Sequence, residues 1–599
     1  VACHKCHGDP DGSGPLPAPA QGDNAYSHPT RKDCGSCHDD WDPALLYSAN
    51  NTGMPPQPDN NSCLFCHPAD GGALPSRALH KHPLVDEAVH QDFQFVVTSI
   101  AEAGTNDGSG TFEAGEKMQV TFELKTVVGN MDVPAANLNR IEFSIAGPVH
   151  NRQMLHTARV DIGSLGAGPS YTINVPYDYE NQFLGDSTGA LGDVFMIPQG
   201  TPTAGSTPTV FARTATGAAT SLSANVPVAQ NYIDVGNAGG FVRNGYLVID
   251  DGTMTEEYFR IQFVDLAANR IWFTSPYSGG YKIETEFTHF AGALVMPVTL
   301  TTLVAGVDYM IAGDTITELV EFGAGAAVVA NYSADWIVPA MYGTPLNGSP
   351  DFTEMRGKWT GKSLVPGTYT FGIWGRESFS VSAYGETTSY QGTTNATNTD
   401  FQVGVGSPVS SYDLISSADN CNACHDTMYF HGGGRRGFDS CIMCHGTTAS
   451  EDRPQYVAAN AGATTRVAVE FREMLHKIHM GAELDNPTAY VINGFGQGYP
   501  NNFSEHTYEN VVFPPFNGEA KQCVACHGSS DSWQVPGNRS HPTEQMLPSL
   551  DWTASCGSCH NSAAAGAHMA TQMAGSVEAC SVCHGPGGVE SVELIHKEF

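Results

Sequence analysis

Between residues 91 and 410 the chain alternates hydrophobic and polar side chains with a period of two, which is typical of half-buried β-strands. Turn residues separate the alternating segments at the spacing of all-β proteins. The segments are FQFVVTSI, KMQVTFELKT, RIEFSIAG, GYLVID, YFRIQFVD, NRIWFTS, GTYTFGIWG and SFSVSAYG. The pattern predicts two β domains, each a sandwich or barrel. The second, at about 205–342, is expected to be inserted into the first, because GTYTFGIWG reads as the closing strand of a sandwich that begins near Phe93.

The two ends of the chain lack this alternation. Residues 1–90 and 411–599 are rich in loop-forming residues, and we expect short helices and irregular segments there. One helix is predicted over 466–481, because Val469, Leu475 and Ile478 recur near helical spacing. It would place His476 and His479 one turn apart on the same side.

All 16 cysteines belong to eight Cys-x-x-Cys-His units, the attachment signal of c-type haem. Two cysteines three residues apart share a helical face, where both sulfurs reach the two vinyl groups of one porphyrin. The histidine that follows can then bind the iron as its proximal ligand. The cysteines are Cys3, Cys6, Cys34, Cys37, Cys63, Cys66, Cys421, Cys424, Cys441, Cys444, Cys523, Cys526, Cys556, Cys559, Cys580 and Cys583. The proximal histidines are His7, His38, His67, His425, His445, His527, His560 and His584.

Zinc ribbons are the alternative to haem for paired cysteines. Zinc does not require a histidine directly after every second cysteine, and no cysteine is left over for a disulfide. We therefore favour haem, with a triheme domain at 1–90, the β domains at 91–410 and a pentahaem domain at 411–599. The haems themselves would supply much of the apolar core of both end domains.

Fifteen of the 23 histidines are not proximal, enough to give each iron a second, distal imidazole. In the C-terminal domain the predicted distal ligands are His431, His476, His479, His568 and His596, and His506 and His541 are left over.

The N-terminal ligands are less determined. The three units of residues 1–90 match the last three of the C-terminal domain in order, so that His80 corresponds to His596 and His28 to His541. We favour His80 and His82, then His28, as distal ligands. The alternatives are His4, His90, Met54 or a residue from a neighbouring chain, and the SHPT sequence that contains His28 can equally be a turn.

The formal net charge is −34, which disfavours binding to nucleic-acid phosphates and suits either cationic partners or a solvated acidic surface. No apolar run is long enough to span a membrane. Haem c is attached outside the cytoplasm, so we expect an exported chain whose leader has been removed.

Residues 105–116 have some of the spacing of a calcium loop, with Asp107, Gly110 and Glu116 at suitable offsets. Thr105 at the first position is a poor ligand, so we expect a plain turn, with calcium as the alternative. His150, His156 and His289 are expected to be surface or turn residues.

The run CNACHDTMYFHGGGRR, CIMCHG, FREMLHKIHMG, CVACHG, CGSCH and CSVCHG resembles the outer-surface multihaem cytochromes of metal-reducing bacteria, the OmcA/MtrC family. The resemblance implies alternating β and pentahaem domains, closely spaced bis-histidine haems, and electron transfer to minerals, flavins or other extracellular acceptors. This chain departs from the family by having three haems in its first haem domain and no first β domain. A filament of copies of the chain is a further hypothesis.

Together these patterns predict an electron-transfer protein rather than an enzyme, located outside the cell or at its outer surface. Its expected partners are other c-type cytochromes or copies of itself, and the β segment can serve in docking. The alternative is a multihaem reductase of nitrite, hydroxylamine or a sulfur oxyanion, which needs one open haem. The Cys34, Cys37 and His38 unit keeps this alternative open, because it has no evident distal histidine.

Overall fold

A computed structural model gives the fold of the chain. The structure describes residues 24–35, 56–72, 74–80, 84, 89–149, 152–198, 202, 207–228, 230, 232–273, 285–343, 361–383, 386–404, 420–421, 425, 428–446, 452, 467–494, 504–512, 523–528, 533–535, 551–574 and 577–597.

Two sheets form the first β group. One has the order β1-β2-β5, and the other has the order β19-β18-β3-β4, with β20 also paired to β18. The bounds are β1 Phe93–Ala103, β2 Lys117–Thr126, β3 Arg140–Gly147, β4 Gln153–Val160, β5 Ser170–Asn174, β18 Gly367–Ala383, β19 Glu386–Thr393 and β20 Thr397–Val403. Inward side chains of both sheets, such as Phe122, Phe143 and Phe371, share one core. Every second residue of β2 is buried, as the alternation of its sequence predicts.

A second β group comprises strands β6 to β17, and each of these strands forms its ladders with other strands of the same group. A nine-stranded sheet has the order β10-β13-β12-β11-β14-β8-β17-β6, with β9 paired to β14, and a smaller sheet has the order β15-β16-β7. The bounds are β6 Pro176–Asp186, β7 Val194–Met196, β8 Thr209–Ala215, β9 Thr220–Ser221, β10 Tyr232–Asp234, β11 Tyr246–Ile249, β12 Glu257–Asp265, β13 Arg270–Phe273, β14 Leu294–Thr302, β15 Tyr309–Ala312, β16 Thr315–Glu318 and β17 Ala327–Asp335. This group starts with β6, earlier in the chain than the predicted insertion at 205, and the domain limits themselves stay a prediction.

Short helices and hairpins make up the described parts of the two ends. Near the N-terminus they are α2 Asn24–Ser27, α3 Arg31–Gly35, α4 Cys63–Cys66 and α5 Ser76–Leu79. Near the C-terminus they are β21 Tyr429–Phe430, β22 Arg435–Arg436, α7 Phe438–His445, α8 Phe471–Met480, η7 Gly481–Glu483, η8 Pro487–Ala489, β23 Val491–Gly494, β24 Ser504–Thr507, α9 Cys523–His527, α10 Asp551–Gly557, α11 Ala563–Thr571, β25 Met573–Ala574, β26 Val577–Glu578, α12 Ser581–His584 and α13 Val592–Lys597. The helix predicted over 466–481 is shorter than expected, because α8 begins at Phe471, after Val469 and the cap residue Glu470, whose side chain accepts a hydrogen bond from Glu473 N.

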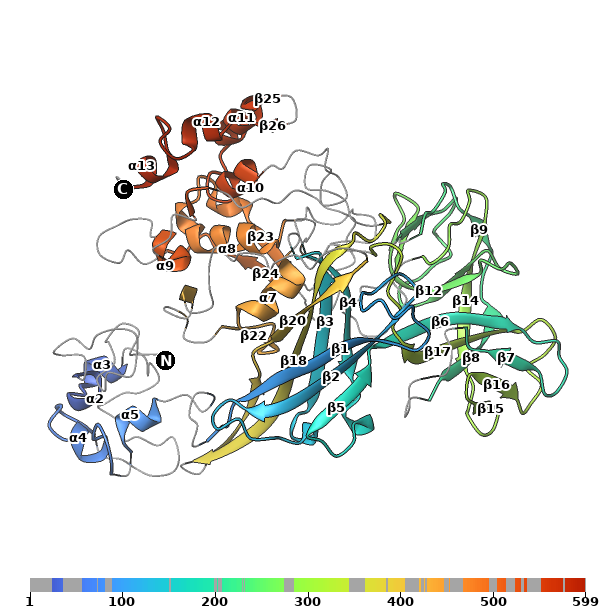
Figure 1. Ribbon diagram of the computed structural model, residues 1–599, viewed down its shortest axis with the longest axis horizontal. Helices are drawn as coiled ribbons and strands as arrows, with labels where there is room; N and C mark the ends of the chain where they lie inside the picture. Colours follow the sequence, from blue (N-terminus) through green and yellow to red (C-terminus); the bar gives the residue numbers. More distant parts are fainter. Residues whose placement is uncertain are drawn as a thin grey trace.

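The ends differ from the β groups in how little side-chain core they have. Among the described residues of 1–90 no hydrophobic side chain is buried, and the largest apolar cluster described near the C-terminus centres on Met428, Phe438 and Ile442. In Figure 1 the first β group lies at the centre, the second β group on one side, and the C-terminal helices on the other. Helix α7 packs on the first β group, against β3, β4, β18 and β20. None of the described helices has the length and apolar character that crossing a membrane requires.

Two histidines of the β groups are buried, so the expectation that they are surface or turn residues was wrong. His156 lies within β4, where its Nε2 bonds Pro176 O at 2.7 Å and its ring stacks on Trp336. His289 is fully buried, with Nδ1 2.6 Å from Asp250 Oδ2 and Nε2 2.6 Å from Glu257 Oε2. Polar partners that are distant in the sequence make this burial possible. His150 lies outside the described residues.

We expect these two histidines to give opposite pH dependences of stability. Burial lowers the pKa of His156 to about 4, so the folded state loses stability as pH falls from the unfolded value of about 6.5. Burial alone would lower the pKa of His289, but Glu257 and Asp250 raise it above its usual value. Its contribution is therefore complete below about pH 6.5 and is lost as pH rises through the raised folded pKa.

Thermal unfolding across this pH range tests both signs. H156Q should flatten the acid limb of the stability curve, and H289Q should flatten the limb above pH 6.5. Equal losses at every pH in both variants would contradict this assignment.

Candidate haem sites

The Cys-x-x-Cys-His units fold as single helical turns wherever a whole unit is described. In three of them the backbone N–H of the histidine donates a hydrogen bond to the carbonyl of the first cysteine. The N···O distances are 2.9 Å for His67 to Cys63, 2.8 Å for His560 to Cys556 and 2.9 Å for His584 to Cys580. This turn places both thiols and the imidazole on neighbouring positions, as thioether attachment requires.

The described cysteines and histidines were compared with the geometry of a zinc site. Within the described ranges, three or more ligand atoms lie close enough to share one metal ion only at Glu102, Asp107 and Glu116, in the first β group. The described cysteines and histidines therefore do not form the four-ligand clusters that structural zinc needs.

Five pairs of imidazole rings face each other in the C-terminal part. The ring centroids are separated by 5.9 Å in His425–His479, 6.1 Å in His431–His445, and 6.2 Å in His476–His527, His560–His596 and His568–His584. Two metal–nitrogen bonds of about 2 Å plus the two ring radii give about the same separation. Each pair joins one proximal histidine to one of the five predicted distal histidines, so the donor set and its spacing fit a haem iron between the rings.

Hydrogen bonds to backbone carbonyls determine the tautomer of four of these rings. The Nδ1 atoms of His445, His479, His584 and His596 bond Val469 O, Leu475 O, Glu590 O and Val592 O at 2.7, 2.8, 2.9 and 2.8 Å. A carbonyl can only accept, so Nδ1 carries the proton and Nε2 keeps its lone pair for a metal.

Burial favours the neutral form of four of the paired rings, which is the form that metal binding requires. Burial, with a smaller contribution from the facing imidazole, lowers the pKa of both His431 and His476 to about 4. It lowers the pKa of His425 and His445 as well. His476 Nδ1 is buried and has no hydrogen-bond partner among the described atoms.

Helix α8 supplies two of the five predicted distal histidines. His476 and His479 lie one turn apart and face His527 of α9 and His425 respectively. The Glu470 cap at its start and the Lys477–Glu473 ion pair, 2.6 Å long, stabilise the helix. His431 comes instead from the turn between β21 and β22, where it adopts a positive φ of 54°.

The N-terminal candidates are only partly visible. His80 follows α5, and its Nδ1 bonds Ser76 O four residues earlier at 2.7 Å, as His596 bonds Val592 O. The sequence repeat that matches His80 with His596 therefore also matches this hydrogen bond to the carbonyl four residues earlier. His28 bonds Ser27 Oγ through Nδ1 at 2.9 Å. Cys3, His4, Cys6, His7, Cys37, His38, Met54, His82, Cys424 and His541 lie outside the described residues.

His90, one of the alternatives, has another role in this fold. It is buried, bonds Glu377 through Nε2 and Leu84 O through Nδ1, and stacks on Phe379. With both ring nitrogens engaged, it is not available to an iron. The pairing of His90 with Glu377 could not be predicted from the sequence, because the two residues are 287 positions apart.

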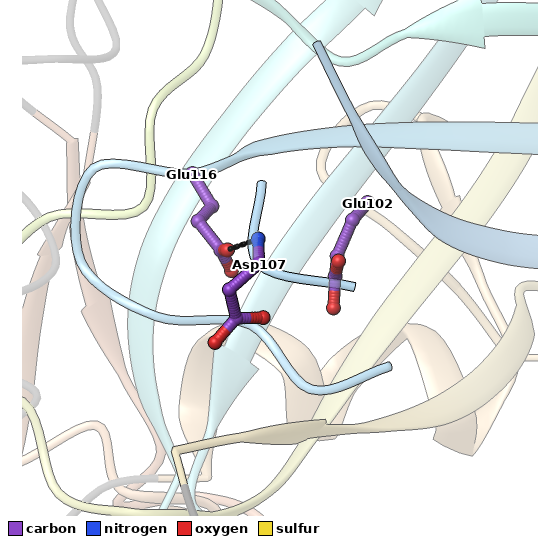
Figure 2. Close-up of side chains that lie close together, drawn as sticks. All are labelled: Glu102, Asp107 and Glu116. Carbon is purple, nitrogen blue, oxygen red and sulfur yellow. Dashed lines mark hydrogen bonds between the residues drawn. The ribbon is translucent and has the colours of Figure 1, made fainter. Parts of the chain in front are cut away.

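The loop at 105–116 brings three carboxylates together (Figure 2). Oxygens of Glu102, Asp107 and Glu116 all lie within 4.8 Å of one another. Glu102, at the end of β1, is the member that sequence spacing missed. Gly110 N donates to Glu102 at 2.7 Å and Glu113 N to Glu116 at 2.8 Å, so the carboxylates also cap the turn. A plain turn therefore stays the prediction for this loop, with calcium as the alternative.

Helical Cys-x-x-Cys-His turns that face second histidines are the defining feature of multihaem c-type cytochrome domains. Residues 414–597 match the family model described as outer membrane cytochrome MtrC/MtrF-like, domains II/IV. This match supports a cytochrome of extracellular electron transfer and agrees with the predicted location at the outer surface of the cell.

Two further comparisons add little. The crystal structure of MtrC from Shewanella baltica OS185 aligns with 13% sequence identity and a TM-score of 0.35, over 98% of this chain and 64% of that one. The chain thus spans less than two thirds of that protein, and at this score the likeness carries no argument. A search of curated proteins found no match.

The ring pairs predict the effect of removing one distal histidine. In the haem-loaded protein, H479A should convert one haem from low-spin to high-spin ferric iron, because His425 loses the ring that faces it. H506A is the matched control, since His506 is exposed in β24 and bonds only Ser504 Oγ among the described contacts. Optical and electron paramagnetic resonance spectra distinguish the two spin states. An H479A protein that remains entirely low-spin would rule out this pairing.

Proposed function

We propose that the protein conducts electrons through eight covalently attached c-type haems, each with a histidine on both faces of its iron, and delivers them to acceptors outside the cell. The acceptors would be metal oxides, flavins or other cytochromes. The five ring pairs carry this proposal, because each supplies two imidazoles at a separation that suits one iron.

The residues divide the work between attachment, ligation and orientation. The paired cysteines of each unit would hold the haem, and the histidine after them would bind one face. In the C-terminal domain His431, His476, His479, His568 and His596 would bind the other face. Carbonyl groups such as Leu475 O and Val592 O orient the rings by accepting from Nδ1.

Bound haem supplies one-electron exchange between ferric and ferrous iron. If each iron has an imidazole on both faces, the haems would leave no coordination site for a substrate, so we expect electron transfer with no bond made or broken and no enzymatic turnover. Because α8 gives one histidine to each of two irons, one turn apart, it would hold those two haems as close neighbours.

The finer assignments extend beyond the described contacts. At the N-terminus, the shared hydrogen bond of His80 and His596 supports His80 as a distal ligand, and His82 and His28 follow as weaker candidates. The net charge of −34 favours cationic partners or surfaces. Assembly with other cytochromes, or with further copies of the chain up to a filament, is a further hypothesis.

A ligand-binding experiment separates conduction from catalysis. We expect the oxidised protein to be entirely low-spin and unchanged by cyanide or nitrite. We also expect the reduced protein to be reoxidised by flavin or by a ferric oxide suspension. A high-spin haem that binds nitrite, with turnover of nitrite or hydroxylamine, would instead support a reductase with one open haem.

A further inference from the structure

A cluster of arginines lies where the C-terminal haem domain meets the first β group. Four guanidinium groups surround the single carboxylate of Glu142, which is 8% exposed, at 2.8 Å for Arg435, 3.3 Å for Arg159, 3.5 Å for Arg140 and 3.7 Å for Arg376. Arg376 and Arg435 are largely buried there. One carboxylate cannot neutralise four cations, so the cluster carries excess positive charge.

The cluster holds the turn that presents His431. A Cβ on Gly434 would lie 1.7 Å from Arg376 Nη2, so this guanidinium rests directly on the backbone of the turn. Arg435, the next residue, packs over the Trp374 ring at 4.4 Å, and Trp374 Nε1 donates to Glu142 at 3.1 Å. Thr393 Oγ1 donates to Gly433 O. Strands β18 and β19 therefore position the ring that faces His445.

The arginines of the cluster also act on one another. Burial is the largest cause that lowers the pKa of Arg376, and Arg140, Arg435 and Arg159 lower it further against the opposing effect of Glu142.

The nearby acids do not remove this excess. Asp92 is paired with Arg436 at 2.5 Å, and Glu377 is bonded to His90. Asp439 has a pKa raised by burial, which disfavours its negative form. An uncompensated positive charge of limited exposure stabilises any added negative charge beside it.

We propose that Arg376 and Arg435 raise the reduction potential of the haem attached at Cys441 and Cys444. The inference rests on the proposed function, since it needs a haem between His431 and His445. One electron from a neighbouring haem reduces this ferric iron to ferrous iron and oxidises the donor by one electron, with no bond made or broken. The propionates are the same on every haem, so they do not account for a difference among them.

A redox titration of the full-length, haem-loaded protein tests the sign of the effect in two directions. R376Q removes a positive charge and should lower the reduction equilibrium constant of one component, the haem attached at Cys441 and Cys444, about tenfold, which is about 59 mV for one electron. E142Q removes the negative charge, leaves the arginines in place, and should shift the same component upward. Opposite shifts are not expected from simple loss of packing.

Two variants serve as controls. R376K keeps the charge and should leave the potential close to that of the unmodified protein. R270Q removes a charge from the second β group, where Arg270 bonds Asp234 at 2.7 Å, and should leave that component unchanged.

Absent shifts, shifts in the same direction for R376Q and E142Q, or equal shifts of all components would each overturn the proposal. If R376Q fails to load haem, E142Q alone decides the sign. Failure of the proposed function has a different signature, which is fewer than eight haems by intact mass or a high-spin fraction in the unmodified protein.

Discussion

The central constraint of the proposed function is to hold two imidazoles opposite each other, with ring centres 5.9 to 6.2 Å apart, so that both can bind one iron. Several features of the chain suit this requirement. Burial favours the neutral form of His431 and His476, whose pKa values it lowers to about 4. Backbone carbonyls accept hydrogen bonds from Nδ1 of rings such as His445 and His596, and helical turns carry the proximal histidine beside its two cysteines.

This constraint explains why the ends and the middle of the chain have such different compositions. The β groups build their cores from alternating side chains, with Phe122 and Phe371 fully buried. The C-terminal part has short helices and little apolar packing of its own, which suits a domain in which cofactors fill the interior. The two parts meet at α7 and at the turn of His431, where Glu142, Arg376 and Arg435 connect this turn to strands of the first β group.

Local signals account for most of what could be predicted. Alternation of period two indicated the strands, and the fixed spacing of each unit identified its proximal histidine. Helical spacing placed His476 and His479 on one side of α8. What was missed depends on contacts distant in the sequence: Glu102 joins a loop through the end of β1, His289 is buried only because Asp250 and Glu257 flank it, and His90 pairs with Glu377. No short-range pattern carries that information.

An experimental structure of the haem-loaded protein, at a resolution that shows the sixth ligand of each iron, tests the central claim most directly. The account predicts irons bridging His425 with His479, His445 with His431, His527 with His476, His560 with His596 and His584 with His568. An iron in the C-terminal domain with water, an open position or a different residue opposite its proximal histidine would contradict it.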